Sequence, residues 1–140
     1  MSRQFDKSLK ALYTLTLPPL RSSSMYAGAE LIKQMKPLPD GGCTIYRGIA
    51  VDEIEHLNNG DKFVIAGFTS GTLTTKAALA LLESDEAPVR IRVPAGIKAV
   101  YHRSEVLDEV VLEAGLLFTV TWVERRVPRL LALEASRIGD

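Results

Sequence analysis

The chain of 140 residues has few residues that could form disulfide bonds or bind a metal, and no long apolar run that could span a membrane. It contains one cysteine, Cys43, so an internal disulfide is excluded. With two histidines, His56 and His102, a zinc site of the Cys/His type has too few ligands. No apolar run approaches the ~20 residues that span a bilayer, and no signal peptide is visible at the N-terminus. We therefore expect a protein without metal or membrane contact that acts in the cytoplasm.

The sequence also lacks an excess of positive charge and the common catalytic motifs. Lysine plus arginine and aspartate plus glutamate each total 17, so the net charge is zero. A nucleic-acid binder that works mainly by electrostatics is therefore excluded. Glycine-rich phosphate loops, H-E-x-x-H and G-x-S-x-G are all missing. These absences remove most nucleotide-binding, metalloprotease and serine-hydrolase classes.

What is present is the composition of one ordinary globular domain, with 46% hydrophobic and 24% charged residues. Its pattern changes once, near residues 37–42, where prolines and glycines interrupt the chain. Residues 1–40 have helical spacing, with a short first helix at Phe5, Leu9 and Leu12. A second helix, capped within 22–24, would place an apolar face on Met25, Gly28, Ile32 and Met35.

Strand signals dominate after residue 42. We expect short helices at 52–57 and 75–82, the second capped by Thr74 or Thr75. Strands are expected near 43–49, 63–68, 89–93, 99–102, 110–112, 116–123 and 129–133. In 116–123 both alternating faces are largely apolar, which predicts a strand buried on both sides with Trp122 in the core. The chain therefore reads as one α+β domain over 1–140, with a helical part at 1–40 and a β-rich core at 43–135.

Three polar residues lie at strand ends or inside strands. In a strand, the Arg47 side chain would point to the same face as those of Ile45 and Ile49. By itself, Arg47 is best interpreted as a surface arginine paired with a carboxylate. Ser70 by itself reads as a turn before a helix cap. Glu109 reads as part of a solvated acidic face, together with Glu105, Asp108 and Glu113.

The order and spacing of these residues favour a different interpretation. The chain contains Tyr46-Arg47-Gly48, then Phe68-Thr69-Ser70-Gly71-Thr72, then Glu109-Val110-Val111-Leu112-Glu113-Ala114-Gly115 running on to Phe118. Together these stretches resemble the R-S-E group of mono-ADP-ribosyltransferases, which have an aromatic-Arg-Gly strand, an S-T-S-like motif and a glutamate in the form E-V-L-x-x-x-G-x-x-F. The resemblance covers residues 43 to 123. It implies an ADP-ribosyltransferase-like mixed β core of two bent sheets, with short N-terminal helices.

The resemblance also implies roles for these residues around NAD, used as a co-substrate without a metal. Arg47 would hold a phosphate of NAD, and the Gly48 backbone would approach the nicotinamide amide. Ser70 would position Glu109, which would bind the nicotinamide ribose and stabilise the positive charge that develops there. Tyr46 and Thr72 would complete the NAD site.

One departure from the family pattern concerns the acceptor. Leu107 stands two residues before the glutamate, where arginine-modifying members carry glutamate and several asparagine- or glutamine-modifying members carry glutamine. Leucine forms no side-chain hydrogen bond, so the acceptor chemistry stays open. Leu107, Tyr101 and Glu105 are the candidate acceptor-contacting residues. A milder departure is Gly71-Thr72 in place of a threonine and a serine.

We therefore predict NAD-dependent mono-ADP-ribosyl transfer to a macromolecular acceptor, a protein in preference to a nucleic acid, with release of nicotinamide. The alternatives are an NAD glycohydrolase, a non-catalytic binding protein with the transferase fold, and a small α+β binding domain in which the motifs coincide by chance. By analogy with the family, the protein would be a bacterial or phage effector of toxin type, and a neutralising partner would be compatible with that role.

Overall fold

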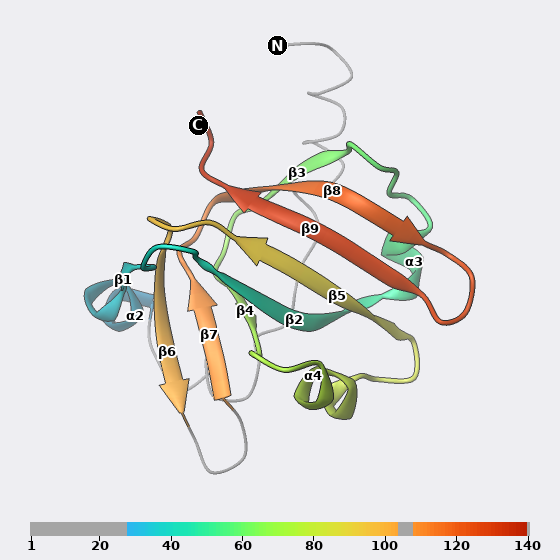
Figure 1. Ribbon diagram of the computed structural model, residues 1–140, viewed down its shortest axis with the longest axis horizontal. Helices are drawn as coiled ribbons and strands as arrows, with labels where there is room; N and C mark the ends of the chain where they lie inside the picture. Colours follow the sequence, from blue (N-terminus) through green and yellow to red (C-terminus); the bar gives the residue numbers. More distant parts are fainter. Residues whose placement is uncertain (1–27, 104–107, 140) are drawn as a thin grey trace.

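The computed structural model describes residues 28–103 and 108–139, and these residues form two β-sheets and three short helices (Figure 1). The elements are α2 (Gly28–Gln34), β1 (Lys36–Pro37), β2 (Cys43–Ala50), α3 (Val51–Ile54), β3 (Lys62–Ile65), β4 (Thr69–Gly71), α4 (Thr75–Leu81), β5 (Glu86–Val93), β6 (Lys98–Arg103), β7 (Asp108–Leu112), β8 (Leu116–Glu124) and β9 (Leu130–Ser136). Within the described residues, no helix is long and apolar enough to cross a bilayer.

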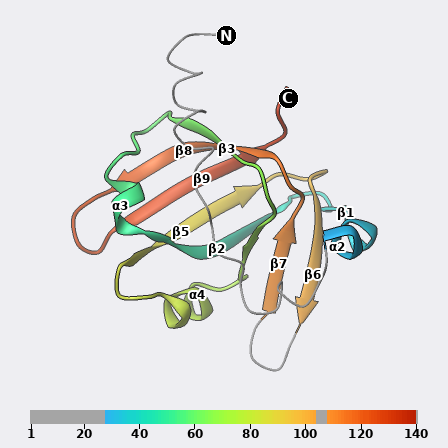
Figure 2. The same ribbon diagram turned by 180° about the vertical axis from the view of Figure 1, so that it is seen from behind.

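The two sheets have four and five strands. The smaller has the order β1-β6-β7-β4 and the larger β2-β5-β9-β8-β3. Every pairing is antiparallel except that of β5 with β9, so the larger sheet is mixed. In both views β6 and β7 run steeply across the direction of β5 and β9 (Figures 1 and 2). The predicted mixed β core of two sheets is therefore confirmed.

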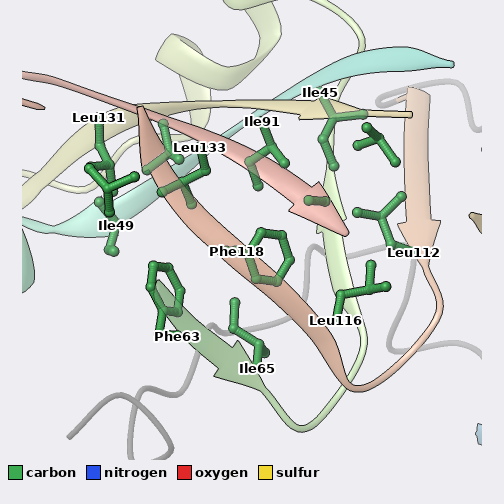
Figure 3. Packing of buried hydrophobic residues seen from close by; sticks show 14 of the residues in the cluster. Ile45, Ile49, Phe63, Ile65, Ile91, Leu112, Leu116, Phe118, Leu131 and Leu133 are labelled. Carbon is green, nitrogen blue, oxygen red and sulfur yellow. The ribbon is translucent and has the colours of Figure 1, made fainter. Parts of the chain in front are cut away.

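The hydrophobic core forms on one face of the larger sheet, where alternate residues of each strand point inward (Figure 3). Strand register aligns Ile45, Ile91, Leu133 and Val120 as a continuous row of buried side chains across four strands. Burial of each such side chain stabilises the fold by roughly 1.5–3 kcal/mol. On the next strand, the Phe63 ring stacks on Phe118 with centroids 5.7 Å apart. This core fixes the position of β2, which carries Arg47.

The two sheets are joined by a β-bridge between Tyr46 of β2 and Thr72, the residue after β4. The Tyr46 amide donates to the Thr72 carbonyl oxygen at 2.9 Å, and the Thr72 amide donates to the Tyr46 carbonyl oxygen at 2.8 Å. Gly71 lies against this bridge, and a Cβ there would come within 2.8 Å of the Tyr46 oxygen and 3.1 Å of the Ile45 Cβ. The glycine in the S-T-S-like motif is therefore required by the approach of the two strands.

A second connection lies at the far end of β7, where Glu113 binds Arg137. Arg137 Nε and Nη2 donate to the two Glu113 carboxylate oxygens, each at 2.9 Å. The Lys98 amide donates to the same carboxylate at 2.6 Å, and Arg137 also donates to the Gly96 carbonyl at 2.9 Å. The ion pair thus ties the end of β9 to β6 and to the turn before it. Glu113 is a structural carboxylate, and the prediction of a solvated acidic face is wrong for this residue.

Most predicted elements are present within a few residues of their expected bounds. Thr74 caps α4 as expected, because its Oγ1 accepts from the Ala77 amide at 3.2 Å. The second helix is present as α2, and the first lies outside the described residues. Two strands were not predicted: β1, which has two residues, and β4, which was interpreted as a turn around Ser70. Short strands carry too few residues to show alternation.

Two predictions about buried faces are wrong. Leu31 of α2 is 4% exposed whereas Ile32 is 63% exposed, so the buried face of this helix differs from the expected one. In β8 the register shifts between Val120 and Trp122. A bulge of this kind changes the side-chain alternation, and Trp122 lies 50% exposed on the strand that was expected to be buried on both sides.

The bridge between the sheets yields a first prediction. Gly71→Ala should lower the free energy of unfolding by about 1–3 kcal/mol, because the added methyl group collides with the β2 backbone. Gly67→Ala is the matched control, since Gly67 is exposed and a Cβ there has open space. Chemical denaturation measures both changes. Equal effects at the two positions would contradict the tight approach at Gly71.

The Glu113–Arg137 pair yields a second prediction. The hydrogen bonds from Arg137 are the main cause that holds the pKa of Glu113 below its ordinary value. The folded-state pKa is therefore lower than the unfolded one, so this stabilisation is present at neutral pH and is lost as the pH falls through the folded-state pKa. Glu113→Gln should lower Tm at pH 7, and its Tm should converge with that of the wild type in acid. A Tm difference that is independent of pH would contradict this assignment.

Candidate active site

The described residues bury few polar side chains, and the three residues of the predicted catalytic group are among them. Arg47, Ser70 and Glu109 are 4%, 3% and 0% exposed. They come from β2, β4 and β7, and therefore from both sheets. Burial of charged groups is costly unless partners compensate for lost water, so the arrangement around these side chains is central to the site.

Arg47 enters the interior because it shares a strand face with Ile45 and Ile49. Its Nη1 donates to the Ser70 carbonyl oxygen at 2.8 Å, and its Nε donates to the Gly48 carbonyl oxygen at 3.3 Å. The interpretation of Arg47 as a surface arginine is therefore wrong. Two main-chain carbonyls replace part of the water that the guanidinium loses.

The charge of Arg47 is set by burial and by two carboxylates. Burial is the larger effect and lowers the pKa of Arg47 to about 10, while the negative charges of Glu86 and Glu109 act in the opposite direction. Arg47 is therefore still a cation at neutral pH. The site places one buried positive charge in the field of two negative ones.

Ser70 and Glu109 lie on the same face of the smaller sheet. The register pairs Ser70 with Val111 and Gly71 with Val110. Glu109 is two residues from Val111 and therefore projects to the same side as Ser70. If this register continues by one residue, Thr72, which is also buried, lies opposite Glu109 on the neighbouring strand. The neighbouring Asp108 is exposed, because adjacent residues of a strand point to opposite faces.

His102 belongs to the same region, although the sequence analysis selected its neighbour Tyr101. The β6–β7 register pairs His102 directly with Glu109, so the imidazole and the carboxylate share a face. Tyr101 points to the opposite face and is 51% exposed. It lines a cavity of about 490 Å³ together with Leu73 and Val110. Leu107 and Glu105 lie outside the described residues.

The Gly48 main chain faces the same edge of β2 as the bridge to Thr72. In an antiparallel ladder, alternate residues direct both N–H and C=O to one edge. Tyr46 uses this edge to bind Thr72, so the N–H and C=O of Gly48, two residues on, lie on the same edge beyond the bridge. This donor and acceptor pair suits a primary carboxamide. The predicted approach of a nicotinamide amide stays a prediction.

The missing side chain of Gly48 makes room for residues of the chain itself. A Cβ at this position would lie 2.6 Å from Leu82 Cδ2 and 3.0 Å from Glu86 Oε1. Glu86 is thus a charged neighbour of the site that the sequence analysis missed. In the sequence it is one of three neighbouring carboxylates, with Glu83 and Asp85, and nothing distinguishes it from them. Strand register brings it to Gly48.

Comparison with solved structures identifies the fold. Vis toxin, an ADP-ribosyltransferase from Vibrio splendidus, is 20% identical over 72% of this chain and 51% of its own, with a TM-score of 0.55. Another Vis structure, in complex with agmatine, is 18% identical over 98% of this chain and 76% of its own, with a TM-score of 0.58. C3stau2 from S. aureus with NAD is 18% identical over 71% of this chain and 63% of its own, with a TM-score of 0.57.

The chain thus spans about half the length of the first Vis chain. No protein-family profile matches the sequence, and no curated protein matches it. The likeness lies in the three-dimensional structure, and it confirms the ADP-ribosyltransferase fold that the three motifs indicate.

The environment of Arg47 yields a third prediction. Arg47→Met keeps much of the side-chain volume but removes the donor to the Ser70 carbonyl. It should lower the free energy of unfolding by about 1–3 kcal/mol. Arg90→Met is the matched control, because Arg90 is an exposed arginine paired with Tyr46 on the adjacent strand, and its effect should stay within about 0.5 kcal/mol. Similar losses in both variants, measured by chemical denaturation, would contradict a buried structural role for Arg47.

Proposed function

We propose that this protein is an NAD-dependent mono-ADP-ribosyltransferase that transfers ADP-ribose to a macromolecular acceptor and releases nicotinamide. One observation carries the proposal: the arginine, serine and glutamate of the three motifs are brought from separate strands into one buried group, within the ADP-ribosyltransferase fold. A solved neighbour of this fold contains NAD, which supports NAD as the co-substrate.

The charges and the hydrogen-bonding groups suit the parts of NAD. The Arg47 guanidinium would bind the pyrophosphate through charge-assisted hydrogen bonds. The N–H and C=O of Gly48 would bind the nicotinamide carboxamide at the edge of β2. Glu109 would accept a hydrogen bond from a hydroxyl of the nicotinamide ribose, and Ser70, on the same face, would keep the carboxylate in place. These contacts would hold the glycosidic bond beside the buried carboxylate.

Cleavage of that bond follows from the same arrangement. The bond between the ribose C1′ and the nicotinamide nitrogen breaks, and its electron pair leaves with nicotinamide. Positive charge then develops on the ribose, as in glycoside hydrolysis, and the preorganised Glu109 carboxylate stabilises it. A nucleophilic atom of the acceptor forms the new bond to C1′ and loses its proton. No residue of the described chain is required as the attacking nucleophile.

The acceptor is a macromolecule, and a protein is favoured over a nucleic acid because the chain carries no net positive charge. Leu107 offers no hydrogen bond to an acceptor side chain. Tyr101 is exposed and lines a cavity on the face of β6 opposite to that of Glu109, so its contact with an acceptor stays a proposal.

The proposed activity yields a fourth prediction. Glu109→Gln should lower the rate of transfer roughly 10²–10³-fold, because a neutral amide no longer stabilises the developing charge, while NAD binding remains. Asp108→Asn is the matched control, since Asp108 is the neighbouring carboxylate and faces away from the site. It should keep near-normal activity. The assay uses NAD labelled on its adenylate half, with purified protein and a bacterial lysate.

The fate of the label distinguishes the possible activities. Label on a discrete macromolecule, present with the wild type and absent with Glu109→Gln, is the expected result. Consumption of NAD without labelled macromolecule would instead indicate an NAD glycohydrolase. Intact NAD together with no measurable NAD binding would contradict both enzymatic functions and leave a binding protein with the transferase fold.

A further inference from the structure

Glu86 is a carboxylate held in a fixed position that neither the motifs nor the proposed mechanism uses. It begins β5, just after the turn that follows α4. Its Oε1 accepts from the Glu83 amide at 2.9 Å, and its own amide donates to the Glu83 carbonyl oxygen at 3.1 Å. This local pair of hydrogen bonds orients the carboxylate.

The carboxylate is oriented toward Gly48. The position that a Gly48 Cβ would occupy lies 3.0 Å from Glu86 Oε1 and 3.1 Å from Glu86 Cδ. Any other residue at position 48 would therefore displace Glu86 or be displaced by it. Glu86 also acts electrostatically on Arg47, as Glu109 does. The arginine consequently lies in the field of two carboxylates, of which the proposed mechanism gives a task only to Glu109.

The charges of NAD suggest a role for Glu86. NAD⁺ carries an anionic pyrophosphate and a cationic pyridinium ring, and in NADH the ring is neutral. A second carboxylate whose field reaches Arg47 weakens the attraction of the site for the pyrophosphate, so it does not improve phosphate binding. Of the charged groups on NAD⁺, only the ring complements a carboxylate. With the carboxamide bound at the Gly48 edge, that ring would be the charged group of NAD⁺ nearest to Glu86.

On the basis of the proposed function, we propose that Glu86 is a specificity-determining residue whose carboxylate faces the cationic nicotinamide ring and selects NAD⁺ over NADH. The ring loses its charge when nicotinamide leaves with the bonding electrons, so the attraction exists for the substrate and is absent for the product. An interaction made mainly with the ground state contributes to KM and adds nothing to kcat. Glu86 therefore differs from Glu109, which acts on the charge that develops during the reaction.

The test compares the binding of NAD⁺ and NADH by calorimetry, in a Glu109→Gln background that prevents consumption of NAD⁺. In this background NAD⁺ should bind at least about tenfold more tightly than NADH. Glu86→Gln keeps an acceptor for the Glu83 amide and should therefore fold. It should weaken NAD⁺ binding about tenfold, equivalent to ~1.4 kcal/mol, and change NADH binding less than about twofold, since a neutral ring has no charge to lose. With Glu109 intact, Glu86→Gln should raise KM for NAD⁺ without lowering kcat.

Glu83→Gln is the matched control, because Glu83 is an exposed carboxylate in the same turn, and it should leave both affinities unchanged. If Glu86→Gln weakens NAD⁺ and NADH equally, Glu86 has a structural role and the inference is wrong, while the proposed function stands. Equal binding of NAD⁺ and NADH by the protein that retains Glu86 overturns the inference without need of the variant. Failure to bind NAD⁺ at all contradicts the proposed function and the inference with it.

Discussion

The site depends on the two main-chain hydrogen bonds that join Tyr46 of β2 to Thr72 at the end of β4. β2 belongs to the larger sheet and β4 to the smaller one, so this bridge sets the distance between Arg47 and Ser70. The bridge in turn requires Gly71, because no side chain fits between the β4 and β2 backbones. Once the strands are fixed, the Arg47 guanidinium reaches the Ser70 carbonyl, and strand register places Glu109 on the Ser70 face. One local contact thus determines the relative positions of residues from three strands.

This arrangement places the positive charge of Arg47 in the protein interior, where burial of a charge is unfavourable for folding. Arg47 occupies a position on the inner face of β2 between Ile45 and Ile49, where an aliphatic residue would pack without loss of water. Main-chain carbonyls and the fields of Glu86 and Glu109 offset part of the cost of burial, yet burial still dominates the pKa of Arg47. The stability of the domain comes instead from the apolar row across the larger sheet and from the Glu113–Arg137 clamp. Burial of the Arg47 cation therefore carries a cost of desolvation that contacts elsewhere offset, while its hydrogen bond to the Ser70 carbonyl makes its removal from the folded protein destabilising.

The sequence predicted the parts of this structure that have local causes. Strand signals after residue 42 located β2, β5 and β6, a threonine cap located α4, and the order of three motifs selected Arg47, Ser70 and Glu109. The failures concern effects that depend on contacts distant in sequence. The burial of Arg47 depends on a carbonyl of another sheet, and the exposure of Trp122 depends on a bulge opposite β9. Glu86 reaches Gly48 only through the pairing of β2 with β5. No periodicity within a single segment contains this information.

The carboxylates of the chain show how environment separates roles that sequence alone does not distinguish. Glu109 and Glu113 belong to one motif, but Glu113 is bound on both oxygens by Arg137, whereas Glu109 lies fully buried on the face of Ser70 and His102. The hydrogen bonds from Arg137 and from the Lys98 amide make the Glu113 carboxylate a part of the fold. This difference in environment supports the role that we propose for Glu109, which is to stabilise a developing positive charge.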